Sequence, residues 1–490
     1  MENVKKADMV VIGSGVTGMA AAVSAAENGL KVAVFEKQKS LGGTSNFFSG
    51  MFAVETEQQR RNYILYDRDE AFQNIMEYSH WRANPRLVRT IVNESANTIS
   101  WLEEHGVEFL DGQINMPKAP RTYQPVKGQG ASVIKALTIA AKESGVDILT
   151  GAPVRRIIKK DGRISGVIYE NDGEMFEVAT NTVIIASGGY ANNSKWIKKY
   201  CGYELDVNLF PVGNVDKMGD GIQMAFEVGA AEEGLGVIEI FCAGPWGADF
   251  AMKGAIEMIA AQPDLWIDQQ GERFCDESIA FYDTSMGNAN ARYKEGYTYR
   301  LFDDSIIGIL MEKGIEKQLG MDNLPGTRPI GFNSEMSAAL KRGSSEVFMA
   351  DSIENLAIKI EVRQNVLKNT IHEYNAFCEK GHDDLFAKDP RYLRPLKGPH
   401  FFAVKARTLF LGTLGGIKIN YKMEVLDKKG HIIPGLYAGG FDAGGMWGDS
   451  YCIKDSSGLS AGFSTTSGRL AGENACSYLS EIEKGKSIES

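Results

Sequence analysis

Three glycines near the N-terminus have the spacing that phosphate binding requires. Gly13, Gly15 and Gly18 fit the pattern G-x-G-x-x-G directly after the apolar run 9–12. The first glycine of this pattern permits a tight turn, the second lets the backbone approach a pyrophosphate, and the third lets the next helix pack closely on the strand. The N-terminus of that helix offers free N–H groups and a positive dipole end to phosphates. The hexapeptide therefore predicts a dinucleotide site.

A carboxylate follows at the distance that a ribose would need. Glu36 ends the second apolar segment, 31–36, where it can accept hydrogen bonds from both hydroxyls of a ribose. Residues 16–28 between the two segments are rich in Ala, as expected of a helix packed on a sheet. The alternative, a purely structural β-α turn, is disfavoured by this context. A β-α-β nucleotide-binding unit is thus predicted.

The residues after Glu36 favour a long ligand. Lys37 is followed by a Gly/Ser/Thr-rich loop over 41–51. Such a loop suits FAD better than NAD, because the pyrophosphate and ribityl chain of FAD need more hydrogen bonds.

Composition bounds the remaining classes. The chain has 490 residues, so two or three folding units are expected, and its net charge of −10 is spread without a basic block. Nucleic acid is therefore not expected as a partner. The six cysteines form no C-x-x-C pair and the six histidines show no metal spacing, so we expect reduced thiols and no metal site. No run is long enough to span a membrane, and a cytoplasmic protein is predicted.

Further along the chain, the elements that position this site alternate between strand and helix. Helical periodicity covers 69–105 and 132–144, buried strands are expected at 146–150 and 182–186, and a meander at 154–178. Residues 237–410 are rich in aromatics and Met, and the glycine-rich style returns after them. We predict an α/β fold with a Rossmann-like FAD-binding domain (1–236 and 411–490) and an inserted α+β capping domain (237–410).

These motifs together resemble the fumarate reductase / succinate dehydrogenase flavoprotein superfamily, which includes the 3-ketosteroid dehydrogenases and FAD-dependent ene-reductases. The resemblance covers nearly the whole chain. It rests on segments 13–18, 36–37, 42–44, 49–51, 186–189, 219–221, 271–274, 302–304, 414–416, 434–439 and 467–473. It implies that the cap closes over the isoalloxazine and that substrate binds between cap and flavin.

The resemblance also implies the cofactor contacts. The loop 38–51 lacks the His that attaches flavin covalently in some relatives, so non-covalent FAD is expected. Without haem or iron–sulfur motifs, electrons must come from an external donor, either NAD(P)H or a redox protein. The oligomeric state stays open. The expected FAD contacts are Gly13, Gly15, Val16, Thr17, Gly18, Glu36, Lys37, Gly43, Thr44, Ser45, Ser49, Gly50, Met51, Val154, Ala186, Ser187, Gly188, Asp220, Gly440, Asp442, Ser460 and Ala461.

The cations that hold a dicarboxylate in fumarate reductases are missing. Phe281 stands at the position of the acid Arg, Gly412 at that of a His, and Asp455 at that of a second Arg. An Asp about 4 Å from a substrate carboxylate costs roughly 4 kcal/mol at an effective dielectric of 20, or about three decades in affinity. Fumarate and succinate are therefore poor candidates. A slip of the alignment near Asp455 would instead bring Lys454 to this position.

Tyrosines remain near the reaction centre. In the 3-ketosteroid dehydrogenase branch, tyrosines at comparable places act as acids, bases or hydrogen-bond donors to a carbonyl. Tyr282 and Tyr451 are the leading candidates for proton donor, after hydride transfer from flavin N5, and Tyr123 is a third catalytic candidate. Each could alternatively be a packed tyrosine with a satisfied hydroxyl.

Nine cap aromatics suggest an apolar, roomy pocket, although most such residues belong to a core. We therefore expect an FAD-dependent oxidoreductase that reduces or forms the C=C bond of a mostly apolar carbonyl small molecule, such as a 3-oxo steroid, a bile acid or an aryl enone. One alternative is a fumarate reductase-like enzyme for another unsaturated carboxylate. Another is a non-catalytic electron-transfer flavoprotein. The nine are Phe241, Trp246, Phe250, Trp266, Phe281, Tyr282, Tyr293, Tyr297 and Tyr299.

Overall fold

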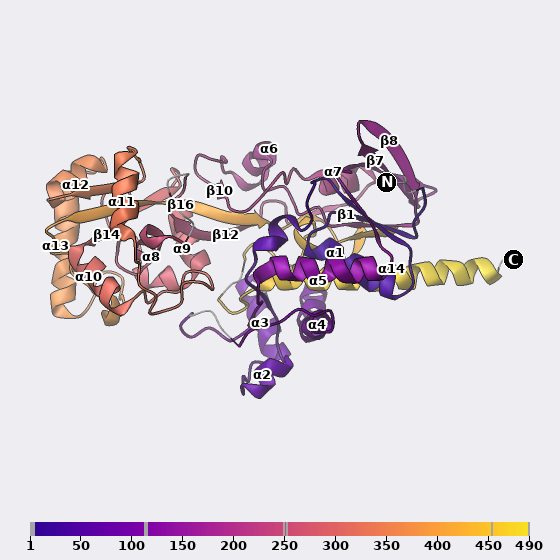
Figure 1. Ribbon diagram of the computed structural model, residues 1–490, viewed down its shortest axis with the longest axis horizontal. Coiled ribbons are helices and arrows are strands. Elements are labelled where there is room, and N and C mark those ends of the chain that lie inside the picture. The colour runs from indigo at the N-terminus through magenta and orange to yellow at the C-terminus, as the bar shows by residue number, and fades with distance from the viewer. Residues whose placement is uncertain (1–4, 112–115, 248–249, 251–252, 452–453, 489–490) are drawn as a thin grey trace.

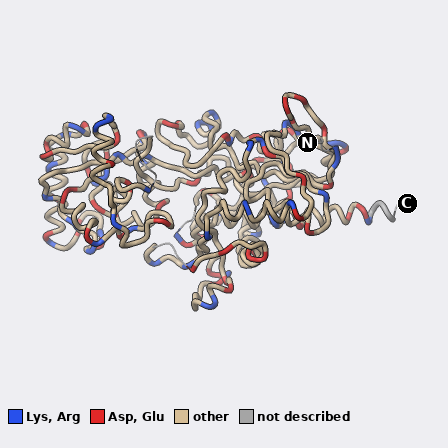
Figure 2. The backbone as a smooth tube through the Cα atoms, in the orientation of Figure 1, with Lys and Arg blue, Asp and Glu red and all other residues tan. Residues whose placement is uncertain are grey.

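The computed structural model describes residues 5–111, 116–247, 250, 253–451 and 454–488. Cys452 lies outside the described residues. The molecule is elongated, with a nucleotide lobe built from both ends of the chain and a second lobe at the other end (Figure 1). Its charged residues are mixed along both lobes (Figure 2), as the sequence predicts. Within the described residues, no helix is long and apolar enough to cross a membrane.

The nucleotide lobe is organised by a six-stranded sheet in the order β18-β19-β9-β1-β2-β5. All neighbours pair in parallel except β18 and β19. The central parallel strands β1, β2 and β9 are short and buried on both faces, which explains their near-continuous apolar runs. The bounds are β1 Met9–Ile12, β2 Val32–Glu36, β5 Asp147–Thr150, β9 Thr182–Ile185, β18 Glu424–Leu426 and β19 Ile432–Ala438.

Two helices from opposite ends of the chain pack together beside this sheet (Figure 1). They are α1 (Val16–Glu27) and α14 (Leu459–Ile488). Their close approach needs glycine, because a Cβ added at Gly468 would lie 2.1 Å from the carbonyl oxygen of Thr17. The C-terminal segment therefore completes the fold that the N-terminal glycine motif begins.

Smaller elements surround the sheet. The meander 154–179 forms a three-stranded sheet, and β3 pairs with β4 next to the glycine-rich loop. The bounds are α2 Glu57–Arg61, α3 Arg68–Tyr78, α4 Pro85–Glu104, α5 Gln129–Glu143, α6 Ser194–Trp196, α7 Asp220–Glu227, β3 Gly50–Phe52, β4 Tyr123–Pro125, β6 Val154–Lys160, β7 Arg163–Asn171, β8 Glu174–Ala179, β11 Glu232–Glu233 and β17 Gly416–Ile417, with short helices η1 Gly43–Phe47, η2 Ile197–Cys201 and η5 Gly440–Asp442.

The second lobe is built around one long strand, β16, which pairs with β10, β12, β14 and β15. Helices α8–α13 cover this sheet (Figure 1). The bounds are β10 Phe210–Pro211, β12 Ile238–Gly244, β13 Leu265–Ile267, β14 Tyr297–Asp303, β15 Val347–Ala350, β16 Phe401–Thr413, α8 Ala255–Ala260, α9 Asp283–Ala291, α10 Asp304–Lys313, α11 Phe332–Lys341, α12 Ile353–Lys359, α13 Gln364–Lys380, η3 Glu277–Phe281 and η4 Pro390–Tyr392.

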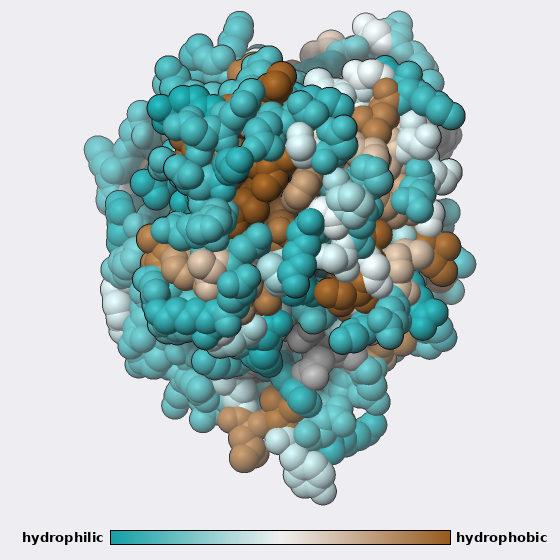
Figure 3. All heavy atoms as spheres, turned by 90° about the vertical axis from the view of Figure 1, so that its left-hand side faces the viewer, coloured by the Kyte–Doolittle hydropathy of each residue, from teal (hydrophilic) through white to brown (hydrophobic). Residues whose placement is uncertain are grey.

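The predicted α/β fold class, with a Rossmann-like unit at the N-terminus, is confirmed by the parallel sheet and α1. The exact domain boundaries at 236 and 410 stay predictions, since β10 and the end of β16 extend the second sheet on both sides of them. The outer end of the second lobe is covered mostly by hydrophilic side chains, with hydrophobic ones in several separate places (Figure 3).

Candidate functional site

A cavity of about 310 Å³ lies at the carboxyl ends of β1, β2 and β9. Parallel α/β sheets bind ligands at this edge, and the volume lies within the range of small-molecule sites. The cavity continues past the turn 186–188 to the first turn of α14 and to one residue of β12, Glu239. It is thus lined by both ends of the chain and by the edge of the second lobe.

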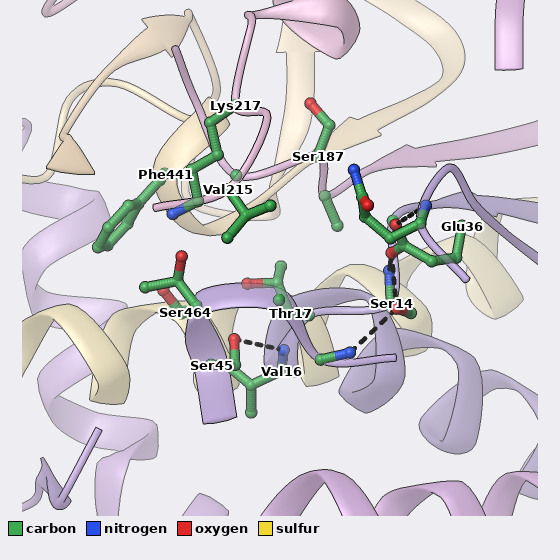
Figure 4. Close-up of a pocket in the computed structure, with 18 of the residues that line it drawn as sticks. Ser14, Val16, Thr17, Glu36, Ser45, Ser187, Val215, Lys217, Phe441 and Ser464 are labelled. Atoms are coloured by element: carbon green, nitrogen blue, oxygen red, sulfur yellow. Dashed lines mark hydrogen bonds between the residues drawn. The ribbon is translucent and has the colours of Figure 1, made fainter. Parts of the chain in front are cut away.

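Glu36 occupies one end of the cavity (Figure 4). Its Oε2 accepts hydrogen bonds from the backbone nitrogen and hydroxyl of Ser14, at 2.9 and 2.6 Å. Its Oε1 accepts one from the nitrogen of Gln38 at 2.8 Å. These bonds fix the carboxylate at the strand end, in the place that the ribose prediction requires.

Glycine is required where the chain turns beneath the cavity. Gly13 has a φ of +103°, and a Cβ there would lie 2.3 Å from the carbonyl oxygen of Ala186. A Cβ at Gly18 would lie 2.0 Å from the carbonyl oxygen of Gly13. The first and third glycines of the motif therefore do what the sequence predicts: they permit the turn and the close packing of α1 on β1.

The N-terminus of α1 faces the cavity at its middle. Gly15 and Val16 line it together with Ser45, whose hydroxyl accepts a hydrogen bond from the Val16 nitrogen at 2.9 Å (Figure 4). The N-terminal turn of a helix together with a hydroxyl forms a suitable cradle for a pyrophosphate.

Asp442 does not line the cavity, although it is one of the FAD contacts expected from the sequence. It is fully buried, and its carboxylate accepts hydrogen bonds from the hydroxyl of Ser187 and the nitrogens of Gly188 and Gly189, at 3.0, 2.9 and 3.0 Å. Burial raises its pKa. The residue before it, Phe441, faces the cavity instead. Asp442 therefore holds the 187–189 turn from behind.

A loop over 212–217 covers part of the cavity, and polar contacts fasten it to the nucleotide lobe. The Lys37 ammonium contacts Asp216 and lies 2.8 Å from a carboxylate oxygen of Asp220. The hydroxyl of Thr44 donates to the carbonyl of Gly213 at 2.9 Å. Lys37 and Asp220, both expected as cofactor contacts, thus line the cavity as an ion pair across it.

The far end of the cavity holds two buried ionisable groups, Lys217 and Glu239. Burial lowers the pKa of Lys217 to about 8, and burial raises the pKa of Glu239 to about 7. The Oε2 of Glu239 has no hydrogen-bond partner among the residues that the structure describes. Environments that displace two neighbouring pKa values toward neutrality are typical of functional sites.

Most of the expected cofactor contacts line this one cavity; six do not. Gly18, Ser49, Gly50 and Met51 are outside its lining, as are Gly440, where an added Cβ would lie 2.4 Å from the Thr17 hydroxyl, and Asp442, which lies behind the 187–189 turn. The expected residues that line it are Gly13, Gly15, Val16, Thr17, Glu36, Lys37, Gly43, Thr44, Ser45, Val154, Ala186, Ser187, Gly188, Asp220, Ser460 and Ala461. Their contact with FAD itself stays a prediction.

The three tyrosines proposed from sequence do not line the cavity. The hydroxyl of Tyr282 donates to the carbonyl of Pro117, and burial, followed by the charge of Asp455, raises its pKa. The ring of Tyr123 packs under Gly50, where an added Cβ would lie 2.6 Å from it. Burial also raises the pKa of Tyr123.

Of the three tyrosines, Tyr451 is the one whose neighbours line the cavity. It is buried, and its hydroxyl donates to that of Ser460 at 3.4 Å. Burial, and then the neighbouring charge of Glu239, raises its pKa well above the ordinary value. Ser460 and Glu239 both line the cavity, so Tyr451 lies one residue behind its wall.

At the three positions where the resemblance expects cations that bind a dicarboxylate, this chain has Phe281, Gly412 and Asp455, and each makes contacts within the protein. Phe281 is buried with its ring centroid 5.2 Å from that of Tyr392. A Cβ at Gly412 would lie 2.4 Å from the ring of Phe441. Asp455 accepts a hydrogen bond at its backbone carbonyl from the Tyr66 hydroxyl, at 3.2 Å.

The cap aromatics belong mainly to the cores of the second lobe rather than to an open pocket. Trp266, Phe281 and Tyr299 are buried, and none of the nine lines the cavity. The sequence-based argument for a roomy aromatic pocket is therefore not supported by their placement. The apolar wall of the cavity comes from other residues, which sequence reasoning did not select: Phe47, Phe48, Val212, Val215, Met224, Leu411 and Phe441.

Sequence reasoning also missed Lys217 and Glu239. A signal existed for Lys217, which stands two residues before the motif Gly219-Asp220-Gly221. None marked Glu239, an acid within an apolar strand whose exposure to the cavity depends on how β12 meets the nucleotide lobe.

The donors and shape of the cavity fit FAD. It joins the Glu36 carboxylate at the end of β2, the helix N-terminus beside Gly15 after β1, and a far end past β9 where Phe441 lies beside Lys217 and Glu239. A Cβ at Gly15 would lie 3.3 Å from the Ser45 hydroxyl, so a side chain here would fill the cradle.

Comparison with known proteins agrees. Residues 8–450 match the FAD binding domain family. The chain is 33% identical over 480 residues to the vinyl phenol reductase of Lactiplantibacillus plantarum, covering 96% of both chains. It is 27% identical over 483 residues to a fumarate reductase (cytochrome) of Shewanella frigidimarina, covering 96% of this chain and 77% of that one.

Among solved structures, the 3-ketosteroid-Δ4-(5α)-dehydrogenase of Rhodococcus jostii RHA1 superposes with a TM-score of 0.75 at 21% identity, covering 97% of this chain and 98% of that one. This likeness confirms the fold. The expected family resemblance and the expected cofactor are likewise confirmed. The chain belongs to the FAD binding domain family and is an FAD-dependent oxidoreductase that acts on carbon–carbon bonds.

Proposed function

We propose that this protein reduces a C=C bond conjugated to an aromatic ring or to the carbonyl of a mostly apolar small molecule. The observation that carries the proposal is the contact between Phe441 and Gly412. At the position where the resemblance expects a His for a dicarboxylate, the chain has no side chain, and a phenyl ring fills the space and faces the cavity. A wall of this kind favours an apolar or aromatic substrate over a small diacid.

Two further observations support an aromatic substrate. Phe281 replaces the expected acid Arg and is buried against Tyr392. The relative that is 33% identical over nearly the whole chain is a vinyl phenol reductase. The steroid alternative is supported by a likeness of fold and by a relative of lower identity, a digoxin reductase of Eggerthella lenta at 26%, so an aryl alkene or aryl enone is the preferred class.

Bound FAD supplies the hydride that such a reduction needs. The chain must supply a proton to the other carbon of the double bond, and Tyr451 is the preferred donor. Its hydroxyl is protonated at neutral pH, as that of any tyrosine is, and its bond to Ser460 leads to the cavity wall. Tyr282, hydrogen-bonded to Pro117, and Tyr123, packed under Gly50, are less well placed.

An electron-transfer subunit without catalysis is the less favoured function. It would require an extended apolar docking face, and the end of the second lobe displayed in Figure 3 is mainly hydrophilic. An external electron donor remains part of the proposal in either case.

The proposal is tested by anaerobic reoxidation of dithionite-reduced holoprotein. The probes are 4-vinylphenol, an aryl enone such as 4-phenyl-3-buten-2-one, a 3-oxo-4-ene steroid and fumarate. Reoxidation by the aryl probes at least tenfold faster than by fumarate is expected. Faster reoxidation by fumarate would contradict the proposal.

The proton donor is tested separately with Tyr451→Phe, with Tyr282→Phe as the matched variant. Removing one general acid costs about 10²–10⁴-fold in rate. Tyr451→Phe is expected to lose at least a hundredfold in reoxidation by the best probe while keeping FAD bound. Loss of that size in Tyr282→Phe alone would move the role to Tyr282.

A further inference from the structure

Lys217 is an unusual residue for the wall of a flavin cavity. The residue is only 8% exposed, and its ammonium extends into the cavity toward Phe441 and Ser464 (Figure 4). The Nζ atom lies 5.1 Å from the centroid of the Phe441 ring. No hydrogen-bond acceptor or ion-pair partner for Nζ is found among the described residues. A buried, unpartnered ammonium is costly unless a ligand with negative charge compensates it.

The position of Lys217 is fixed by the fold. Its backbone nitrogen donates to the side chain of Asn192 at 2.9 Å. Its stem crosses Gly188, where an added Cβ would lie 3.2 Å from the Lys217 Cε. The contact with Gly188 places the ammonium beyond the phosphate cradle, on the side away from Glu36.

Other groups at this end of the cavity set its charge. Ser460 and Ala461, in the first turn of the 30-residue helix α14, line the cavity and bring the positive end of a helix dipole to it. The ionisable groups that act on Lys217 are the carboxyls of Glu239 and Asp442. Asp442 is already engaged by three hydrogen bonds of the 187–189 turn, so Glu239 is the acid with a free oxygen here.

We propose that Lys217 supplies the positive charge that stabilises the reduced, anionic form of bound FAD, and that ionised Glu239 opposes it. Two electrons and one proton taken up by oxidised FAD leave one negative charge on the isoalloxazine; a second proton would give the neutral form. Lys217 favours uptake of the single proton. The electrons come from the external donor in the cell and from dithionite in the test. The inference rests on the cofactor and is independent of which alkene is reduced.

The size of the effect follows from Coulomb's law. Two unit charges roughly 6–10 Å apart at an effective dielectric of about 20 change an equilibrium constant by about 15- to 100-fold. For a two-electron couple, a tenfold change corresponds to 29.6 mV. Removing the Lys217 charge should therefore lower the midpoint potential by about 35–60 mV.

The test measures the midpoint potential of holoprotein variants by reduction against redox dyes, without any alkene. Lys217→Met is compared with Lys217→Arg, which keeps a charge, and with Lys142→Met, which removes an exposed charge on α5. We expect the equilibrium constant for reduction of bound FAD to fall 15- to 100-fold in Lys217→Met and to change by less than threefold in both controls. In the Glu239→Gln background, where the titration of Glu239 is removed, the potential should fall by about 30 mV per pH unit near neutral pH, one proton per two electrons, and by a value closer to 59 mV once Lys217→Met is added.

Glu239→Gln gives an independent measurement if Lys217→Met fails to retain FAD. Because the pKa of Glu239 is raised to about 7, its negative charge is present at pH 8 and mostly absent at pH 6. Glu239→Gln should raise the midpoint potential relative to wild type at pH 8 and have little effect at pH 6. An unchanged potential in Lys217→Met, or an unchanged potential in Glu239→Gln at pH 8, would overturn the proposal.

Discussion

Replacing Asp442 by Ala should weaken FAD binding strongly, although Asp442 does not line the cavity. Its carboxylate accepts three hydrogen bonds, from Ser187, Gly188 and Gly189, in a fully buried place. Alanine leaves the two glycine N–H groups without an acceptor, at a cost of about 1–3 kcal/mol each. In the apoprotein the turn relieves this cost by moving, and bound FAD must return the turn to its original position. We take the resulting loss of FAD-binding free energy as about 3 kcal/mol, which corresponds to a rise of more than a hundredfold in the dissociation constant.

The assay is titration of apoprotein with FAD, followed by quenching of flavin fluorescence, together with the melting temperature of the apoprotein. Asp442→Asn is the matched control, because its carbonyl oxygen keeps one acceptor for the turn, and it should lose at most about tenfold. An Asp442→Ala variant that folds and binds FAD within threefold of wild type would refute the role assigned to this turn.

Three further predictions concern packing and buried charge. Gly18→Ala places a Cβ 2.0 Å from the Gly13 carbonyl oxygen, and should cost about 1–3 kcal/mol in urea unfolding and impair FAD retention. Burial raises the pKa of Glu239 from 4.5 to about 7 in the folded apoprotein. The free energy of unfolding should therefore fall by about 3 kcal/mol as the pH rises through this range, because the folded state holds the proton that the unfolded state has released. Glu239→Gln should remove this pH dependence from apoprotein unfolding. Arg300 is buried, and its guanidinium nitrogens have no hydrogen-bond partner among the described residues. Its guanidinium carbon lies 3.5 Å from the centroid of the Trp266 ring. Because an unpaired buried charge is costly, Arg300→Met should raise the melting temperature, and a lower melting temperature would show that the charge is stabilising.

The nucleotide lobe could be predicted from sequence because its signals are local. The apolar runs 9–12 and 182–185 are buried strands, and the glycines of the first motif turn the chain where their spacing indicates. The predicted helix at 132–144 coincides with α5 except at its ends, since α5 begins three residues earlier and ends one residue earlier. Strands buried on both faces and glycines with fixed roles leave little freedom for another fold.

The far end of the cavity could not be predicted, because it depends on contacts between distant segments. A shift of one position in the short turn 440–442 decides whether Phe441 or Asp442 faces the cavity, and the spacing of the sequence motifs does not determine this position. Lys217 lies at the end of the loop 212–217, which Lys37 and Thr44 fasten to the nucleotide lobe through Asp216 and Gly213. The tyrosines were selected by resemblance, and their hydroxyls are occupied by partners such as Pro117 and Ser460 that only the fold brings near.

The proposed reduction of an aryl-conjugated double bond is tested most directly by mixing reduced holoprotein anaerobically with 4-vinylphenol and measuring flavin absorbance and the ethyl product together. We expect one equivalent of 4-ethylphenol per FAD reoxidised, at a rate well above that with fumarate at the same concentration. Reoxidation by fumarate with formation of succinate, and none by the aryl alkene, would contradict it.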